Sequence, residues 1–403
     1  MPNDRRNVNS MSVCFVSHSA YVAGAERALL EAIKSLTDRG ITCHVLLPYK
    51  GPLCEELSKL NVAFRVVKYQ PWVYGGSMSW WRRMRSLFIS LVMVIPVLVT
   101  ILRWRSSIVY TNTTTVFTGA VAAYLTGRPH IWHVHEYGYL EHGLRFICGK
   151  KFSLSLISRL SVLCIAASKA IADALQGFIP PSKLKVIYQS VSVSNPVMPA
   201  QIESSAFKCI FVGQIAEGKN QEEAIMAVAE LVKRGMNIEL YLIGNSYEDY
   251  TARLNSLIAR NGIQDNVRFL GFKNDAYSYM CIADVVLMCS RSEGFGRVTV
   301  EGMLAGKVII GARSGATTEL VEDGVTGLLY TLGAYKELAQ KIEYVFNNPA
   351  QAELMGKSAK EWASAKFSQE RYGDDLMQAL FEVGKSGNRR SKPTVKARSN
   401  DLL

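Results

Sequence analysis

The stretch Val285–Gly306, VVLMCSRSEGFGRVTVEGMLAG, contains the pattern that decides the fold. Its first residues are apolar and predict a short buried strand. Gly294 and Gly296 then form a turn, and a helical pattern follows through Val298–Leu304. A strand that passes through a glycine turn straight into a helix is the repeating unit of a parallel sheet covered by helices. The stretch therefore predicts an α/β fold.

The same turn is suited to holding an anion. Glycines let the backbone approach a ligand closely, and the free N–H groups and dipole of the helix start favour negative charge, such as a diphosphate. Glu301 lies about one turn into the helix, where its carboxylate can accept both hydrogens of a vicinal diol, such as a ribose. Glu293, before the turn, can do the same for sugar hydroxyls. The alternative is that both glutamates are solvated charges that stabilise the helix slightly.

Strand and helix patterns alternate on both sides of this stretch. In the first half, strands are predicted over residues 13–16, 42–47, 108–111, 130–135 and 162–166. In the second half, they are predicted over residues 208–212, 239–243, 267–270, 285–288 and 307–310. Helical patterns separate most of them, so we expect parallel sheets with helices on both faces.

The chain length and one break in the pattern predict two domains with a cleft between them. A chain of 403 residues is too long for one core, and a Ser/Pro-rich stretch at residues 192–205 is typical of a linker. We expect Rossmann-like domains over residues 1–195 and 206–365. A helix at about 366–383 can pack on either domain, and the tail at 384–403 is basic and predicted to be disordered.

A second turn strengthens the case for an anion site. The strand ending at Val212 runs into Gly213-Gln214-Ile215-Ala216-Glu217-Gly218-Lys219 before the next helix. A lysine at a helix start opposes the helix dipole, so Lys219 is better explained if it faces an anion. The alternative is a solvated surface lysine.

The first domain supplies two further candidates. Gly24 lies in a small-residue turn after the first strand, at a strand's carboxyl end, where α/β folds bind ligands. His133, His135 and Glu136 end another strand, and the histidines can donate hydrogen bonds or shuttle protons. Gly-x-Gly-x-x-Gly is absent from the sequence, which argues against a dehydrogenase. Zinc would need further ligands at fixed spacing, and the absence of Asp-x-Asp disfavours a metal-held diphosphate.

Charge and cysteine usage exclude several other classes. The formal charge of +12 is concentrated in five arginines around residues 82–105 and in the tail, rather than spread along a groove with stacking aromatics, so a nucleic-acid partner is disfavoured. The eight cysteines show no Cys-x-x-Cys spacing and are typical of a reduced, cytosolic protein. The polar start of the chain does not resemble a signal peptide.

One apolar segment allows two interpretations. Leu87–Leu102 is almost wholly apolar, is interrupted by Pro96 and is shorter than the roughly 20 residues that span a bilayer. It is either a buried helix or an element that dips into a membrane surface, where the flanking tryptophans and arginines would anchor it to anionic headgroups.

Taken together, these residues resemble the retaining GT-B glycosyltransferases of family 4, also called glycosyl transferases group 1. The resemblance covers nearly the whole chain. The matching segments are residues 22–27 with the Gly-Gly-Ala-Glu-Arg loop, His135-Glu136 with the strand-end His-Asp/Glu, residues 211–219 with the phosphate clamp, Glu293–Glu301 with the Glu-x7-Glu motif, and residues 305–309 and 324–327.

The resemblance implies roles for these residues. It implies donor binding by Gly24, Gly213, Lys219, Gly294, Phe295, Gly296 and Glu301. It implies catalytic roles for Glu293 at the transferred sugar and for His135 near the sugar and acceptor, with Gln214, Arg297, His133 and Glu136 as further candidates. It also implies retention of anomeric configuration without a metal or other cofactor, and a C-terminal helix that crosses back onto the first domain.

Two segments depart from the family's pattern. Gln214 stands where the family has a clamp arginine, and we expect Arg297 or Arg291 to compensate. Tyr188-Gln189-Ser190 replaces the usual Pro-Asn-Gly.

The sequence thus predicts a transferase that moves a sugar from a nucleotide-sugar to a glycan or lipid-linked acceptor, in cell-surface polysaccharide or glycolipid synthesis. Its expected place is cytoplasmic, at the inner membrane face. One alternative is a scaffold protein that has lost catalysis, which the two departures favour. The other is a sugar-nucleotide epimerase, which the Glu-x7-Glu pattern disfavours.

Overall fold

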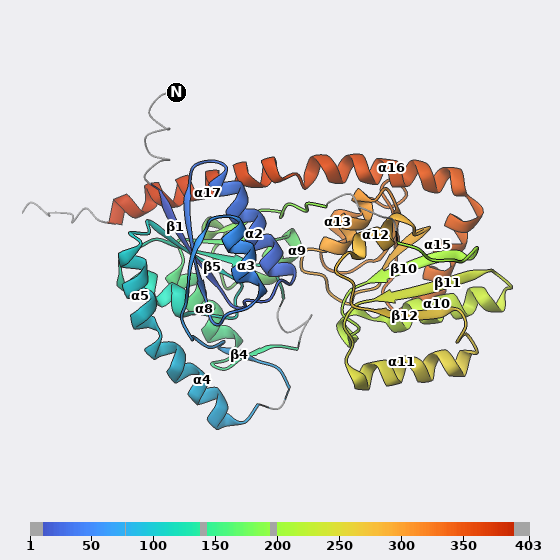
Figure 1. Cartoon of the computed structure of the whole chain (residues 1–403), viewed down its shortest axis with the longest axis horizontal. Helices are drawn as coiled ribbons and strands as arrows, with labels where there is room; N and C mark the ends of the chain where they lie inside the picture. The colour runs from blue at the N-terminus through green and yellow to red at the C-terminus, as the bar shows by residue number, and fades with distance from the viewer. Residues whose placement is uncertain (1–10, 77, 138–142, 194–199, 391–403) are drawn as a thin grey trace, which may run out of the picture.

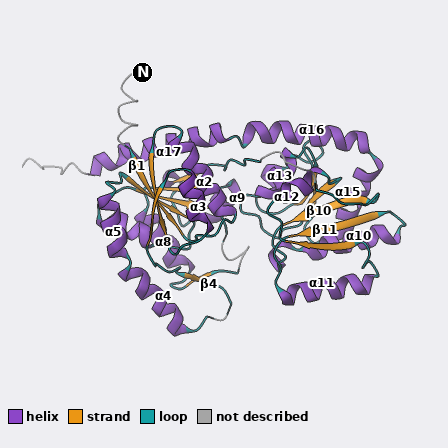
Figure 2. Cartoon of the chain, viewed as in Figure 1, coloured by secondary structure: helices purple, strands orange, loops and turns teal. Residues whose placement is uncertain are grey.

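The structure, a computed structural model, describes residues 11–76, 78–137, 143–193 and 200–390. Two sheets form the centres of two domains, and helices lie on both sides of each sheet (Figures 1 and 2). Every pairing within these two sheets is parallel. The predicted α/β class with two Rossmann-like domains is confirmed.

The first sheet has the strand order β3-β2-β1-β5-β6-β8-β9. Its strands are β1 (Ser12–Ser17), β2 (Thr42–Leu47), β3 (Ala63–Val66), β5 (Ile108–Asn112), β6 (His130–Val134), β8 (Leu163–Ala166) and β9 (Leu184–Val186). The helices of this domain are α2 (Gly24–Thr37), α3 (Pro52–Lys59), α4 (Trp80–Val92), α5 (Val94–Arg103), α6 (Thr118–Leu125), α8 (Lys150–Leu160) and α9 (Lys169–Leu175). A short antiparallel pair, β4 (Val73–Tyr74) and β7 (Arg145–Phe146), lies beside them.

The second sheet has the strand order β12-β11-β10-β13-β14-β15. Its strands are β10 (Phe207–Val212), β11 (Ile238–Ile243), β12 (Val267–Gly271), β13 (Val285–Met288), β14 (Val308–Ala312) and β15 (Leu328–Tyr330). The helices are α10 (Gln221–Lys233), α11 (Glu248–Asn261), α12 (Ala276–Cys281), α13 (Arg297–Leu304), α14 (Thr317–Leu320), α15 (Tyr335–Asn347) and α16 (Pro349–Lys366). The central strands are buried on both faces, which explains their continuous apolar sequences.

The strand orders place the candidate residues. In each sheet the chain first builds outward from its first strand and then returns to that strand's other side, so β1 pairs with β5 and β10 pairs with β13. In open α/β sheets, ligands bind beyond the carboxyl ends of the strands at this reversal point. Three of the residues that the sequence analysis selected, Gly24, Lys219 and Glu293, lie in the segments that follow β1, β10 and β13.

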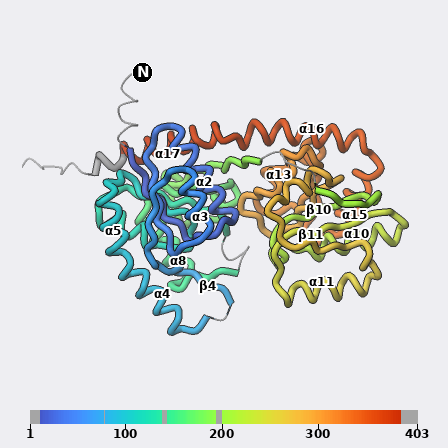
Figure 3. Tube along the Cα trace, viewed as in Figure 1, coloured from blue at the N-terminus to red at the C-terminus, as the bar shows by residue number. Residues whose placement is uncertain are grey.

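The chain returns to the first domain at its end. α16 packs on α13 in the second domain, and α17 (Gln369–Arg390) then runs along the first domain (Figure 3). Arg39, just after α2, holds α17 through Asp374, with Nη2 2.7 Å from Oδ1. Tyr372 and Leu376 of α17 are buried in the core of the first domain.

Several details differ from the sequence prediction. All the predicted strands are present with ends within two residues, but short strands such as β9 and β15 and the 18-residue helix α16 were not foreseen. α17 continues to Arg390, beyond the predicted end at Val383, because no proline interrupts it before Pro393. The remaining tail, 391–403, and the linker residues 194–199 lie outside the described residues.

The apolar segment also differs. Instead of one run interrupted at Pro96, two helices meet at Met93, and Pro96 lies in the first turn of α5, where a missing N–H costs no helical bond. Together, Trp80–Arg103 make 24 residues that are long and apolar enough to cross a membrane by length and composition, contrary to the predicted shortfall. However, α5 buries Val97 and Ile101 in the domain core.

Candidate active site

The two predicted anion-binding turns of the second domain lie side by side, because β10 pairs directly with β13. Lys219 follows β10 and Glu293 follows β13, and Lys219 Nζ lies 2.8 Å from Glu293 Oε2. The two side chains keep only 26% and 12% of their exposure. Lys219 therefore faces an acidic partner rather than open solvent. Its role toward a diphosphate stays a prediction.

The glycine turn before α13 is shaped by two constraints. Gly296 caps the helix with a φ of +90°, which side chains rarely tolerate. A Cβ at this position would lie 2.9 Å from Leu320 Cδ1 and 3.3 Å from Glu293 Cγ. The turn therefore places backbone without a side chain beside Glu293. It does so at the N-terminus of α13, where free N–H groups attract negative charge.

The predicted donor-binding role of Phe295 concerns its backbone, and that role stays a prediction. Its side chain is buried, with its ring centroid 5.6 Å from that of Phe367 and 6.5 Å from that of Tyr188. The ring packs between the domains and is shielded from solvent. Only its backbone remains available to a donor.

A neighbouring loop fixes the backbone of Glu293. Ala316 donates its N–H to the carbonyl oxygen of Glu293 at 2.8 Å. Gly315, with a φ of +49°, packs so closely that a Cβ there would lie 2.6 Å from Glu293 N. The position of the Glu293 carboxylate thus depends on a loop that carries no candidate side chain of its own.

Glu301 lies between the domains. It lies about one turn into α13, and Arg27 of α2 places Nη1 3.8 Å from its Oε1. Burial raises the pKa of Glu301 above its usual range, and the charges of Arg297 and Arg27 oppose this shift. The carboxylate therefore has cationic neighbours from both domains.

Arg297, one of the two residues expected to compensate for Gln214, is engaged by an acidic side chain of the first domain. It is bound to Glu31 of α2 by two contacts, Nη2–Oε1 at 2.8 Å and Nη1–Oε2 at 2.9 Å. Both side chains are largely buried. Gln214 is exposed, and the backbone of Arg291 donates to the Gly218 carbonyl beside it. Arg291 therefore remains the candidate for the missing cation.

The start of α2 faces the start of α13 across the domain boundary. A Cβ on Gly24, the first residue of α2, would lie 3.9 Å from Arg297 Cδ at the first position of α13. Two helix N-termini, one from each domain, therefore converge beside Lys219, Glu293 and Glu301. Both present the positive end of a helix dipole.

The two candidate histidines of the first domain, His133 and His135, are buried. His133 Nδ1 lies 2.6 Å from the hydroxyl of Tyr110, and burial lowers its pKa to about 3. His135 Nε2 lies 2.6 Å from Asn112 Oδ1, and its Nδ1 lies 2.7 Å from Gln189 Nε2. Burial sets the pKa of His135 well below its ordinary value. With both ring nitrogens occupied, His135 is not arranged as a proton shuttle here.

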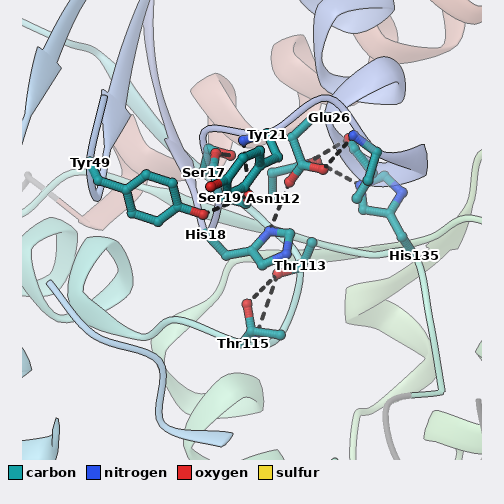
Figure 4. Close-up of polar contacts among 12 residues, drawn as sticks. Ser17, His18, Ser19, Tyr21, Glu26, Tyr49, Asn112, Thr113, Thr115 and His135 are labelled. Atoms are coloured by element: carbon teal, nitrogen blue, oxygen red, sulfur yellow. Dashed lines mark hydrogen bonds and ion pairs between the residues drawn. The ribbon is translucent and has the colours of Figure 1, made fainter. Parts of the chain in front are cut away.

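Two residues that sequence reasoning missed lie beside His135. His18 follows β1 and places Nδ1 3.1 Å from Oε1 of Glu26, which is buried at the start of α2. Figure 4 shows this pair with Asn112 and His135 next to it. Glu26 also accepts the backbone N–H of Ala23, so it caps α2. Glu136 is partly buried near this pair.

Among the residues that the structure describes, no group of three or more His, Cys, Asp or Glu side chains is placed to hold a metal ion.

Glu31 and Gln189 were also missed as site residues. Glu31 belongs to no local motif, and Gln189 was noted only as part of the Tyr188-Gln189-Ser190 departure. Contacts with Arg297 of the second domain bring both to the site.

Paired sheets with reversal points, facing helix N-termini and a Glu-x7-Glu helix define the GT-B class. The family profile described as "Glycosyltransferase Family 4" matches residues 22–195, and that described as "Glycosyl transferases group 1" matches residues 199–362. The chain belongs to the group 1, family 4 glycosyltransferases.

Characterised relatives and solved structures agree. The chain is 31% identical to an alpha-D-kanosaminyltransferase of Streptomyces kanamyceticus over 43% of this chain and 45% of that protein. It is 24% identical to the capsular polysaccharide glycosyltransferase CapM of Staphylococcus aureus over 64% and 72%, respectively. The first relative is thus matched over about half its length. A structure of Anabaena HepE in complex with UDP has a TM-score of 0.76 and 25% identity, covering 92% of this chain and all of that one.

Proposed function

We propose that this protein transfers a sugar from a UDP-linked donor to a glycan or lipid-linked acceptor, with retention of anomeric configuration and without a metal. The observation that carries the proposal is the convergence of the α2 and α13 N-termini beside Lys219, Glu293 and Glu301. UDP is favoured because the similar Anabaena protein has been crystallised with UDP and with UDP-glucose.

The proposed site can meet the charge of a leaving diphosphate. Lys219 and two helix N-termini would stabilise the negative charge that develops as the sugar leaves, which is the largest contribution in many transfer reactions. When the diphosphate takes Lys219, Glu293 would be released toward the hydroxyls of the transferred sugar. Glu301 would accept the ribose hydroxyls. The diphosphate oxygen would help to take the proton of the acceptor hydroxyl, as the family resemblance implies.

A thermal-shift screen tests donor binding. UDP, UDP-glucose, other UDP-sugars and GDP-mannose are added to the wild type, to Glu301→Ala and to the exposed-site control Glu353→Ala. We expect a UDP-sugar to raise the melting temperature of the wild type and of the control, and to lose most of that effect in Glu301→Ala. Equal stabilisation of Glu301→Ala would refute the ribose role. For retention, NMR of the transfer product should show the anomeric configuration of the donor.

We also propose a cytoplasmic enzyme held at the inner membrane face through the α4–α5 surface. α4 has a polar inner face and an apolar outer face. Ser86 and Ser90 are buried and donate hydrogen bonds to backbone carbonyls of residues 70–71. Phe88 and Leu91 of α4 are exposed, as is Ile95 at the start of α5. A helix in a soluble protein normally shows the opposite pattern. The outer face therefore suits an apolar medium.

The charge around this surface supports the same proposal. Between Glu56 and Glu136 the sequence contains nine lysines and arginines and no aspartate or glutamate. Trp80 and Trp81 are exposed at the start of α4, as in interfacial anchors. Each basic residue near an anionic leaflet contributes about 1 kcal/mol of attraction. Because the inner face of α5 belongs to the domain core, the pair is proposed to dock on the membrane and not to span it.

A flotation assay tests the docking. We expect the wild type to float with vesicles containing phosphatidylglycerol and to float less with pure phosphatidylcholine. A Phe88→Glu/Ile95→Glu variant should remain in the soluble fraction, and Leu354→Glu, an equally exposed position on α16, should behave as the wild type. A wild-type protein that stays soluble with anionic vesicles would contradict the docking without affecting the donor proposal.

A further inference from the structure

A continuous set of side-chain hydrogen bonds links the two domains through Gln189. Asn112 donates its amide to the backbone carbonyl of Ala25 at 3.0 Å, which orients the Asn112 oxygen toward His135. His135 Nε2 lies 2.6 Å from that oxygen, and His135 Nδ1 lies 2.7 Å from the amide nitrogen of Gln189. The Gln189 oxygen in turn lies 3.4 Å from Arg297 Nη1 on α13.

The direction of each bond fixes the protonation of His135. Asn112 Oδ1 only accepts, so His135 Nε2 carries the proton. The Gln189 amide donates, so His135 Nδ1 is bare and accepts. A ring with one proton is neutral, which agrees with its burial and with the positive or titratable neighbours His133, His18 and Arg297.

Gln189 can donate to His135 because Arg297 occupies its other end. A guanidinium only donates, so it orients the Gln189 oxygen toward itself and leaves the amide hydrogens for the imidazole. Arg297 also donates to the Ser190 carbonyl at 3.1 Å. Glu31 holds the Arg297 guanidinium, and Ser190 Oγ donates to Glu31 Oε2 at 3.2 Å. Gln189 and Ser190 are buried, with 2% and 0% exposure.

We propose that Gln189 is a positioning residue for the transfer reaction: it holds His135 as the neutral Nε2–H tautomer and links its orientation to the donor-side helix α13 through Arg297. The role in transfer rests on the proposed function. The fixed tautomer does not, and it can be observed without turnover. Tyr188-Gln189-Ser190, which stands in place of the family's Pro-Asn-Gly segment, thereby has a function in this chain: it supplies Gln189.

As a consequence, His135 does not take up a proton in the neutral pH range. A cationic His135 would face Arg297 with His18 and His133 close by, and would oppose the closed contact between the domains. Of the carboxylates in the surroundings, Glu26 is paired with His18, Glu136 lies near Glu26, and Glu31 is already paired with Arg297. Gln189 supplies a donor at His135 Nδ1 without adding charge.

The test replaces Gln189 by residues of similar size but different hydrogen bonding. Gln189→Glu presents acceptors and draws a proton to Nδ1, so His135 should become cationic in the neutral pH range. Gln189→Leu removes the bond, so the tautomers should mix. Gln351→Glu, exposed on α16, is the control for added charge. Nitrogen-15 NMR of histidine-labelled protein reports the protonation of each ring nitrogen.

We expect one bare nitrogen, Nδ1, for His135 in the wild type and the control, two protonated nitrogens in Gln189→Glu, and averaged signals in Gln189→Leu. In transfer assays, Gln189→Leu should lower kcat about 10- to 100-fold with little change in donor KM. Gln189→Glu should lose kcat as the pH falls through the raised pKa of His135, where the wild type stays flat. An unchanged His135 spectrum in both variants would overturn the inference. If the spectra are as expected but the wild type neither binds a donor nor transfers a sugar, the proposed function is overturned instead.

Discussion

The carboxyl ends of the two sheets carry different chemistry. In the second domain, β10 and β13 are followed by Lys219 and Glu293, a charged and partly exposed pair. In the first domain, β5 and β6 lead into Asn112 and His135, which are neutral and buried. Since each edge lies beside a helix N-terminus, both share the same positive potential. At the charged edge, Lys219 and Glu293 can give up their mutual contact to bind a charged ligand. At the neutral edge, hydrogen bonds hold Asn112 and His135 in one orientation.

The largest effect should come from breaking the contact between the edges. Arg297→Met leaves Glu31 buried without its cation, and loss of one partner of a buried pair costs about 3–5 kcal/mol. We expect this fall in the free energy of unfolding by chemical denaturation. Lys185→Met, which removes an exposed pair with Glu382, should change it by less than about 1 kcal/mol. Equal effects would show that the Arg297 contact is not buried in solution.

The next effect concerns the charged edge alone. Lys219→Met should lower kcat/KM about 100- to 1000-fold, because one preorganised donor to the leaving diphosphate is lost. The measurement is a steady-state transfer assay with a UDP-sugar, and Lys336→Met on the exposed face of α15 is the control. Near wild-type activity in Lys219→Met would mean that the pair with Glu293 is structural.

The buried histidines along β6 should be visible in the pH dependence of stability. Burial lowers the pKa of both His130 and His133 to about 3. The unfolded chain takes up protons below about pH 6.5 while the folded chain does not, so this stability is complete above that pH and is lost as the pH falls toward 3. Each histidine should lower the free energy of unfolding by about 1.4 kcal/mol between pH 8 and pH 5.5. Denaturant titrations that show no decline would contradict neutral, buried histidines.

The smallest effect should come from adding charge to the charged edge. Gln214→Arg places a cation at an exposed position beside the Lys219 turn, where an exposed pair contributes about 0.2–1 kcal/mol. Donor KM should therefore fall by up to about fivefold in the same assay. An unchanged KM at low and high salt would indicate that the donor phosphates do not approach Gln214.

The sequence was sufficient wherever the physical cause is local. The apolar run before Glu293, the glycines of the turn and the helix through Glu301 follow from neighbouring residues, and the structure reproduces them. The side-by-side placement of the Lys219 and Glu293 turns follows from the strand order of the α/β class. Local rules therefore predicted both the class and the second-domain half of the site.

The remaining features depend on contacts between distant segments. Arg297 is 266 residues from its partner Glu31, and no local pattern marks either as a pair. Gln189 could be noted only as a departure, because its partners His135 and Arg297 come from different domains. The packing of the Phe295 ring could not be predicted either, since its neighbours in space, Tyr188 and Phe367, are far away in the chain. Such interactions require the tertiary structure.

The loop beside Glu293 has a consequence for natural variation. Gly315 carries no side chain and is assigned no contact with a ligand, yet any other residue there would collide with the Glu293 backbone and adopt an unfavourable φ. In a saturation library scored for sugar transfer, this glycine should tolerate substitution as poorly as Glu293 itself. An inherited substitution of Gly315 would then abolish activity by displacing Glu293, although Glu293 itself is unchanged.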